Sequence, residues 1–236
     1  MSGFDFVNFL MWYVVFVYST VCHEAAHAWS ALKLGDPTAY HGGQVSLDPT
    51  PHVRRELVGM VVVPILSFIS AGWILGWASA PYDPQWAERH PRRAGWMALA
   101  GPVANLILLL LAALLIRVGM EWGAFVPPSF RDWDISHITQ ATEGRFFEFS
   151  ATLLSIIFSL NLLLFTFNLL PLPPFDGSNV ALLFLSVPAA EKYRAFMWNP
   201  NARLFGMFMA FYGFSKIFPT IQLSALNLLY PGMRYL

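Results

Sequence analysis

Residues 6–27 read FVNFLMWYVVFVYSTVCHEAAH, an apolar run that ends in two histidines and a glutamate. The run is uncharged from Phe6 to Cys22, which predicts a helix embedded in a membrane. On a helix, His23 and His27 lie one turn apart on the same face, where both imidazoles can reach one metal ion. Glu24 lies beside them, where its carboxylate can take a proton from a metal-bound water. Placing ionisable side chains at membrane depth costs free energy, so we expect these three residues to have a function.

The composition of the whole chain indicates a membrane protein. Of its 236 residues, 56% are hydrophobic and 12% are charged, against about 25% charged residues in a soluble domain. We expect an all-α polytopic membrane protein, a bundle of about five to six transmembrane helices of about 20 residues each. We expect one domain over 1–236, with a membrane core over 6–188 and C-terminal helices over 203–230. Besides the first segment, the apolar segments are Leu57–Tyr82, Ala94–Ile116, Phe149–Phe175, Gly177–Ala190, Leu204–Ser215 and Ile217–Tyr230.

Charge and cysteine content exclude several classes of function. The formal net charge is zero, which implies neither a nucleic acid nor an acidic partner. Basic residues are balanced between alternate loops, so the positive-inside rule assigns no orientation. The single cysteine, Cys22, excludes an internal disulfide and a zinc site made of several cysteines. No basic stretch precedes Phe6 and no small-residue cleavage site follows Cys22, so we expect this segment to be retained rather than removed as a signal peptide.

The segment after the histidines contains signals for the end of a helix and for a β-hairpin. Gly35-Asp36-Pro37 is a helix-stop signal and predicts that the first helix ends at Leu34. Over Thr38–Leu47, the pair Gly42-Gly43 lies between β-forming residues, which predicts a small β-hairpin.

A second candidate for the metal site lies far along the chain. A catalytic zinc ion usually has three protein ligands and one open position, so two histidines are incomplete. Asp176 is the only charged residue between Glu148 and Glu191. It follows a proline-rich stretch, which breaks a helix and exposes backbone groups that a bilayer tolerates only against protein or a wet cavity. Asp176 is therefore a candidate ligand, and a helix N-cap before Gly177 is the alternative.

At this point the sequence resembles a known family. HEAAH at 23–27, joined to Asn168-Leu169-Leu170-Pro171 and then Asp176-Gly177, resembles the site-2 protease family of intramembrane zinc metalloproteases. Gly101-Pro102-Val103-Ala104-Asn105 matches the third-helix motif of that family. The resemblance runs from about Phe6 to Pro188 and is closest to the short bacterial and archaeal members without a PDZ domain. It implies an integral protein of a prokaryotic cell membrane.

The resemblance implies a zinc metalloendopeptidase that hydrolyses peptide bonds in or near transmembrane segments. Its partners are a transmembrane protein or peptide substrate and the lipid bilayer. It implies one zinc ion, with Glu24 as the catalytic acid/base that deprotonates a zinc-activated water. Asn168 is the first candidate for stabilising the oxyanion, and Asn105 is the second, although interhelical hydrogen bonding explains Asn105 equally well. The implied zinc ligands are His23, His27 and Asp176.

The predicted hairpin suggests how such an enzyme holds its substrate. A transmembrane helix must unwind before its peptide bonds are accessible, and an edge strand can bind the unwound segment through backbone hydrogen bonds. The candidate substrate-binding residues on this edge are Thr38, Tyr40, Val45 and Leu47.

Two other functions use the same residues. In a membrane metal-ion transporter, the ligands would form a transit site, but no further ionisable pair lies at membrane depth. In a catalytically inactive relative, the chain would only bind membrane helices, but HEAAH and Asp176 are intact. The sequence specifies neither a particular substrate nor an oligomeric state.

Overall fold

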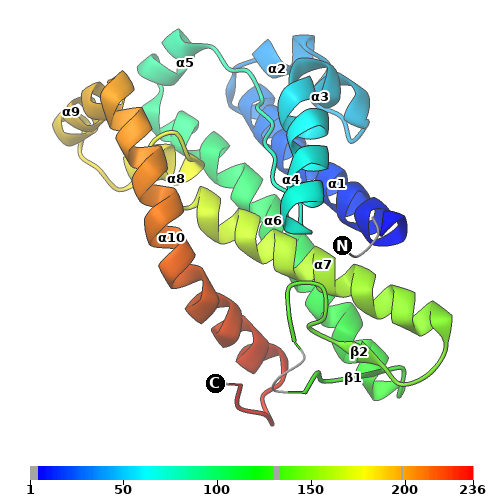
Figure 1. The fold of residues 1–236 in the computed structure, drawn as a ribbon. Coiled ribbons are helices and arrows are strands. Elements are labelled where there is room, and N and C mark those ends of the chain that lie inside the picture. The colour runs from blue at the N-terminus through cyan, green and yellow to red at the C-terminus, as the bar shows by residue number, and fades with distance from the viewer. Residues whose placement is uncertain (1–4, 130–132, 198, 236) are drawn as a thin grey trace.

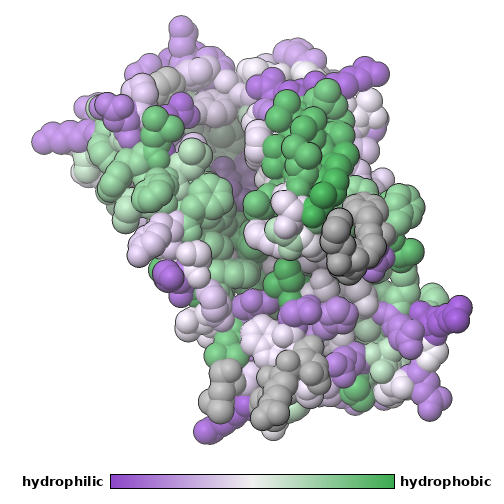
Figure 2. Space-filling model, viewed as in Figure 1, coloured by the Kyte–Doolittle hydropathy of each residue, from purple (hydrophilic) through white to green (hydrophobic). Residues whose placement is uncertain are grey.

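The computed structural model describes residues 5–129, 133–197 and 199–235. Within these residues, four helices are long and apolar enough to cross a membrane: α1 (Phe6–Leu34), α6 (Pro91–Glu121), α7 (Arg145–Asn168) and α10 (Pro200–Leu229). α1 packs against α6 and α7, and α7 also packs against α10. Figure 1 shows α10 on one side of this bundle and α1 on the other. In Figure 2, hydrophilic side chains gather at the two ends of the visible face, with a hydrophobic band between them. The predicted all-α polytopic membrane protein is confirmed.

The ends of α1 are fixed by local chemistry. Asp5 caps the start, where its carboxylate accepts a hydrogen bond from the Asn8 amide at 3.1 Å. Gly35 ends the helix in the left-handed conformation, with φ of 103°, and its amide donates to carbonyls of the last turn. The predicted end at Leu34 is confirmed.

Two clusters of buried apolar side chains hold the helices in register. The first lies between α1, α7 and the segment after Val58, and the second lies between α6, α7 and the end of α10. Together they fix α1 against α6 and α7, and therefore fix the position of the histidines. The buried members include Trp12, Phe16, Met60 and Ile156 in the first cluster, and Ile116, Phe158, Leu226 and Tyr230 in the second.

The predicted helical segment over Leu57–Tyr82 is helical only in its first half. A π-helix, η1 (Val58–Val62), continues into α4 (Val63–Ala71), which ends where Gly72 takes a φ of 76°. The Leu75 amide then donates to the Ser67 hydroxyl at 2.9 Å, and the chain returns in extended form.

The returning chain runs beside the helix that it has just left. The Trp77 amide donates to the Gly59 carbonyl at 3.1 Å, and a Cβ atom on Gly59 would overlap the Trp77 backbone. Glycine at position 59 therefore permits this close return. The segment turns back instead of forming one long helix, and its extended part continues past Gly76.

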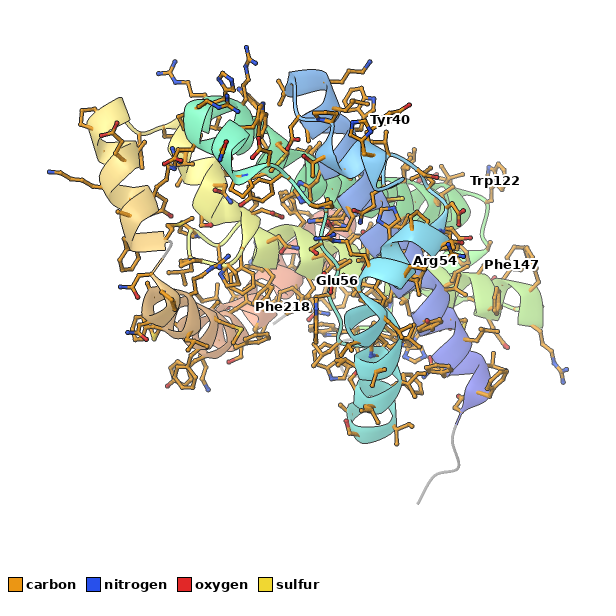
Figure 3. All side chains as sticks on the ribbon, turned by 90° about the horizontal axis from the view of Figure 1, so that it is seen from above. Tyr40, Arg54, Glu56, Trp122, Phe147 and Phe218 are labelled. Atoms are coloured by element: carbon orange, nitrogen blue, oxygen red, sulfur yellow. The ribbon has the colours of Figure 1, made fainter. Side chains whose placement is uncertain are left out.

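The predicted hairpin over Thr38–Leu47 is wrong. Asp36 accepts hydrogen bonds from the amide and the hydroxyl of Thr38, at 3.0 and 2.5 Å, in a local turn, and a short helix, α2 (Thr38–His41), begins at Thr38. Tyr40 lies at the periphery (Figure 3) and is 54% exposed. Irregular turns and α3 (Pro49–Arg55) follow. Among the described residues, the small antiparallel sheet instead pairs β1 (Phe125–Val126) with β2 (Gln140–Ala141).

Of the remaining elements, three pack against α6 and the last one packs against α10. They are α5 (Pro84–Arg89), α8 (Asp176–Val180), η2 (Ala181–Leu183) and α9 (Val187–Met197). α10 is one helix with Pro219 inside it, although the sequence predicted two apolar segments there. Four spans are found within the described residues, against about five to six predicted. The prediction counted the segment of α4 as a span and counted α10 as two helices.

Candidate active site

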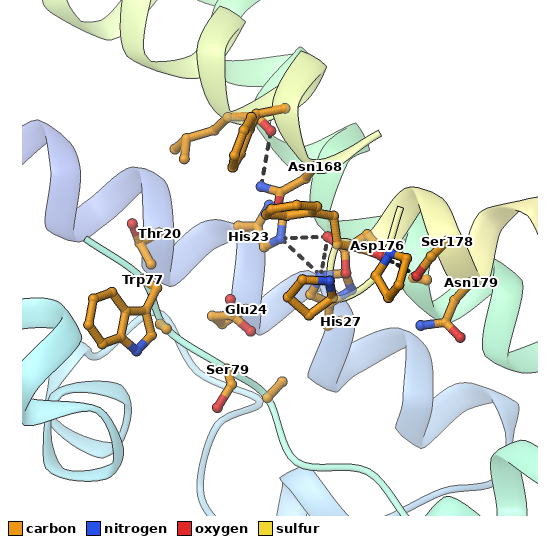
Figure 4. A pocket seen from close by; sticks show the side chains of 18 of the residues that line it. Thr20, His23, Glu24, His27, Trp77, Ser79, Asn168, Asp176, Ser178 and Asn179 are labelled. Atoms are coloured by element: carbon orange, nitrogen blue, oxygen red, sulfur yellow. Dashed lines mark hydrogen bonds and ion pairs between the residues drawn. The ribbon is translucent and has the colours of Figure 1, made fainter. Parts of the chain in front are cut away.

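Three potential metal ligands converge in a pocket of the bundle (Figure 4). The Nε2 atoms of His23 and His27 lie 2.9 Å apart on consecutive turns of α1. Oδ2 of Asp176, the first residue of α8, lies 3.1 Å from Nε2 of His23 and 3.2 Å from Nε2 of His27. Both histidines are buried, and about 10 Å of helix rise separates His27 from the end of α1. The structure therefore brings together all three residues that were predicted as ligands.

The hydrogen bonds around the imidazoles suit a bound cation. Nδ1 of His27 lies 2.8 Å from the Met97 carbonyl, which only accepts, so in the neutral imidazole Nδ1 carries the hydrogen and Nε2 presents a lone pair. Nδ1 of His23 lies 2.6 Å from Oδ1 of Asn105, also an acceptor. Two lone pairs and a carboxylate oxygen thus face one another within about hydrogen-bond distance. A bound cation would remove the electrostatic repulsion between these three electron-rich atoms. Two imidazoles and one carboxylate form a ligand set that suits zinc, with room for a fourth ligand.

A glycine on α6 keeps the space between these ligands open. A Cβ atom at Gly101 would lie 2.6 Å from Nε2 of His23 and even closer to Nε2 of His27. Any larger residue would fill the place where a bound ion meets the imidazoles. The GPVAN motif therefore contributes to the site through its first residue as well as through Asn105.

Asp176 reaches the histidines because the chain folds back after α7. Prolines at 171, 173 and 174 prevent α7 from continuing. A Cβ atom on Gly177 would overlap the Leu169 carbonyl, so glycine permits the chain to lie against the end of α7. The N-cap position of α8 is occupied by Phe175, whose side chain cannot form a capping hydrogen bond. Asp176 therefore does not cap the helix, and its carboxylate is directed to the imidazoles.

The ligands line a cavity of about 780 Å³ that also contains Glu24. Glu24 is 6% exposed, and within the described residues its carboxylate makes no hydrogen bond or ion pair. Phe167 forms part of the apolar wall, with its ring centroid 4.5 Å from that of Phe175 and 5.2 Å from that of Phe211. A carboxylate without a partner beside three potential ligands is available for proton transfer. The wall also contains Thr20, Trp77, Ser79, Leu164, Asn168 and Met207.

The two candidate oxyanion donors occupy different places. Asn168 lines the cavity, and its amide nitrogen donates to the Leu164 carbonyl at 3.0 Å, which uses one of its two hydrogens. Asn105 is fully buried behind His23 and is absent from the cavity wall. Its amide nitrogen donates to the Ser19 carbonyl and to Asn161. Only Asn168 therefore has an amide hydrogen free to meet a ligand.

Some residues of the site were not anticipated from the sequence. The extended segment over Gly76–Ala80 lines the cavity, whereas none of the four residues of the predicted hairpin edge does. The paired glycines at 59 and 76 could have indicated a close backbone return. The role of the Met97 carbonyl could not have been predicted from the sequence, because every residue has a backbone carbonyl whatever its side chain. The four hairpin residues outside the wall are Thr38, Tyr40, Val45 and Leu47.

Comparisons with known proteins found one matching family and a similar protein. The family model described as Peptidase family M50 matches residues 11–211. The provisionally named zinc metalloprotease YwhC of Bacillus subtilis (strain 168) is 34% identical over 169 residues, which cover 71% of this chain and 65% of that protein. The chain thus spans less than two thirds of the length of this relative. No solved structure matches the chain.

Proposed function

The chain belongs to peptidase family M50, the site-2 protease family, and from that premise we propose that it is a zinc metalloendopeptidase that cleaves peptide bonds in or near transmembrane segments. Its substrate is a transmembrane protein or peptide reached within the bilayer, and its location is a prokaryotic cell membrane. The observation that carries the proposal is the unpaired carboxylate of Glu24 beside three convergent ligands, inside a cavity of a membrane-embedded bundle.

We assign His23, His27 and Asp176 as the ligands of one zinc ion. Zinc held there supplies a Lewis acid that polarises a carbonyl and makes water a better nucleophile near neutral pH. Glu24 accepts a proton from the attacking water and returns it to the departing amide nitrogen, as a general base and then a general acid. Glu24 is buried in the cavity, which limits the contact of its carboxylate with bulk water.

Asn168 is the proposed oxyanion donor. Asn168 lines the cavity, and one of its amide hydrogens is bound to the Leu164 carbonyl, which holds the side chain in place; within the described residues the other amide hydrogen is free. A fixed donor of this kind stabilises charge that develops on the scissile carbonyl oxygen. Asn105 orients His23 in this proposal, because both its amide hydrogens are already bound.

The extended segment Gly76–Ala80 takes the substrate-binding role that the sequence assigned to a hairpin. Within the described residues, the amides of Ala78 and Ala80 donate no hydrogen bond, and both residues line the cavity. An unwound substrate has free backbone carbonyls, which need donors at membrane depth. We propose that the substrate binds along this segment as an added strand.

Cleavage of a transmembrane peptide by the purified protein tests the assignment. We expect cleavage in detergent that a chelator stops and added zinc restores. Glu24→Gln is expected to abolish cleavage and to retain zinc, because it removes the base and leaves the ligands. Glu148→Gln, at the start of α7 and outside the cavity wall, is the control and is expected to cleave normally. Equal cleavage by Glu24→Gln and wild type would refute the proposal.

Zinc flux into vesicles separates this function from metal transport. Among the described residues, one cluster of at least three potential metal ligands is present, whereas transit needs further sites along a path. We expect reconstituted protein to cleave peptide without moving zinc across the bilayer. Zinc uptake without cleavage would favour a transporter, and substrate binding without either would favour an inactive relative.

A further inference from the structure

A buried row of polar side chains connects His23 to two neighbouring helices. Oδ1 of Asn105, on α6, lies 2.6 Å from Nδ1 of His23. Nδ2 of Asn105 donates to Oδ1 of Asn161, on α7, at 2.8 Å. Nδ2 of Asn161 donates to the hydroxyl of Ser19, on α1, at 3.0 Å. Asn105 and Asn161 are both fully buried, so each polar atom in the row needs a protein partner.

A backbone carbonyl sets the orientation of the Asn105 amide. Nδ2 of Asn105 lies 3.3 Å from the Ser19 carbonyl, which accepts and cannot donate. If the amide turned over, Oδ1 would face that carbonyl and Oδ1 of Asn161, and two hydrogen bonds would become two repulsions. The observed orientation therefore turns Oδ1 toward His23 and requires the hydrogen of the neutral imidazole to be on Nδ1.

A second backbone carbonyl sets the orientation of Asn161. Nδ2 of Asn161 donates to the Ile157 carbonyl, one turn earlier on α7, at 2.8 Å. This bond turns Oδ1 of Asn161 toward Asn105, where it can only accept. Asn161 thus presents a fixed acceptor to Asn105, anchored to the backbone of its own helix.

We propose that Asn161 is a positioning residue that holds His23, through Asn105, in the tautomer with a free Nε2 lone pair. The inference rests on the proposed function to the extent that Nε2 is the zinc-binding atom. Asn161 touches neither His23 nor the cavity wall, so its effect passes through the Asn105 amide. Without the acceptor at 161, the Asn105 amide loses one of the two contacts that orient it, and the competing orientation places a donor against Nδ1 of His23. The imidazole hydrogen then moves to Nε2, where it blocks metal binding.

Zinc affinity of the Asn161→Leu variant tests this role without any substrate. Leucine has a similar size and no acceptor, and loss of an outer partner of a metal-binding histidine costs about 10- to 100-fold in affinity. We expect about tenfold weaker zinc binding by chelator competition. Ser159→Ala is the matched control, because Ser159 is buried on the same helix and its hydroxyl has no hydrogen-bond partner among the residues that the structure describes. Its zinc affinity is expected to equal that of wild type.

The nitrogen spectrum of ¹⁵N-histidine-labelled, metal-free protein gives an independent readout. In wild type we expect the His23 signals of the Nδ1–H tautomer, assigned by their loss in His23→Gln. In Asn161→Leu we expect a mixture with the Nε2–H tautomer. A purely structural role for Asn161 would lower stability without changing the tautomer. An unchanged tautomer and unchanged zinc affinity in folded Asn161→Leu would overturn the proposal.

A double-mutant cycle tests whether the effect of Asn161→Leu passes through Asn105. Asn105→Asp replaces the amide by a carboxyl group that accepts from Nδ1 of His23 without help from position 161. In that background we expect Asn161→Leu to cause less than a twofold further loss of zinc affinity, against about tenfold in wild type. An equal loss in both backgrounds would refute transmission through Asn105. If wild-type protein binds zinc and shows the expected tautomer yet cleaves nothing, the protease proposal fails and this inference stands.

Discussion

Gly101 of α6 lies so close to His27 of α1 that a methyl group at position 101 would overlap Nε2 of the imidazole. The same methyl group would lie 2.6 Å from Nε2 of His23. The smallest side chain beyond hydrogen therefore occupies the space that a bound metal ion needs.

We expect Gly101→Ala to weaken zinc binding strongly. Relief of this overlap requires both imidazoles to move, and overpacking of this kind costs about 1–3 kcal/mol, which corresponds to about 5- to 150-fold in affinity. Chelator competition measures the change. Gly213→Ala is the control, because a Cβ atom at Gly213 of α10 meets nothing within 4 Å. Unchanged zinc affinity in Gly101→Ala would show that the ion lies away from Nε2.

Asn168→Ala is expected to lower kcat by about 100- to 1,000-fold with little change in KM, the usual cost of losing one oxyanion donor. The reason is that its free amide hydrogen is needed only when charge develops on the scissile carbonyl. Zinc binding should be retained, since Asn168 makes no hydrogen bond to the three ligands. Steady-state kinetics on a transmembrane peptide provide the measurement, with Asn179→Ala, another residue of the cavity wall, for comparison. A matched loss in both variants would point to the cavity's shape and not to an oxyanion donor.

The sequence was sufficient to predict the elements that depend on local signals. The apolar run from Phe6, the stop at Gly35 and the prolines after Asn168 each act within a few residues, and α1 and the end of α7 follow them. The convergence of His23, His27 and Asp176 was also predictable, because ionisable groups are rare in these apolar segments.

The sequence was misleading where distant contacts outweigh local preference. Gly42 and Gly43 suggested a hairpin, but Asp36 binds Thr38 in a turn and a short helix begins at Thr38 instead. The apolar segment from Leu57 suggested a full membrane crossing, yet it turns back at Gly72. The turn back of the chain depends on contacts between residues far apart in the segment, and a hydropathy pattern contains no information about such contacts.

Tyr230 gives a prediction for stability at high pH. Its hydroxyl donates to the Ile138 carbonyl at 2.9 Å, and burial raises the pKa of this phenol to about 12 from an ordinary value of about 10. The folded state therefore favours the neutral phenol, and this contribution to the free energy of unfolding is complete below pH 10 and is lost as the pH rises through 12.

We expect Tyr230→Phe to lower the free energy of unfolding by about 1 kcal/mol at pH 8, because one buried hydrogen bond is lost. The difference between variant and wild type should shrink between pH 10 and pH 12. Unfolding in detergent, followed by intrinsic fluorescence across this pH range, measures it. Tyr212→Phe, at an exposed position of α10, should change little at any pH. A difference that stays constant up to pH 12 would contradict the raised pKa.

Ala80→Pro tests whether the extended segment beside the ligands binds the substrate backbone. Proline removes the Ala80 amide hydrogen, which donates no hydrogen bond within the described residues, and Pro81 already favours extended backbone at position 80. The fold and zinc affinity should therefore be preserved, while KM for a transmembrane peptide rises by about fivefold to tenfold, the value of one backbone hydrogen bond. Ala80→Gly keeps the amide and should bind substrate nearly as well as wild type. If both variants leave KM unchanged, the substrate strand does not pair with this amide, and the free amide of Ala78 becomes the next position to substitute.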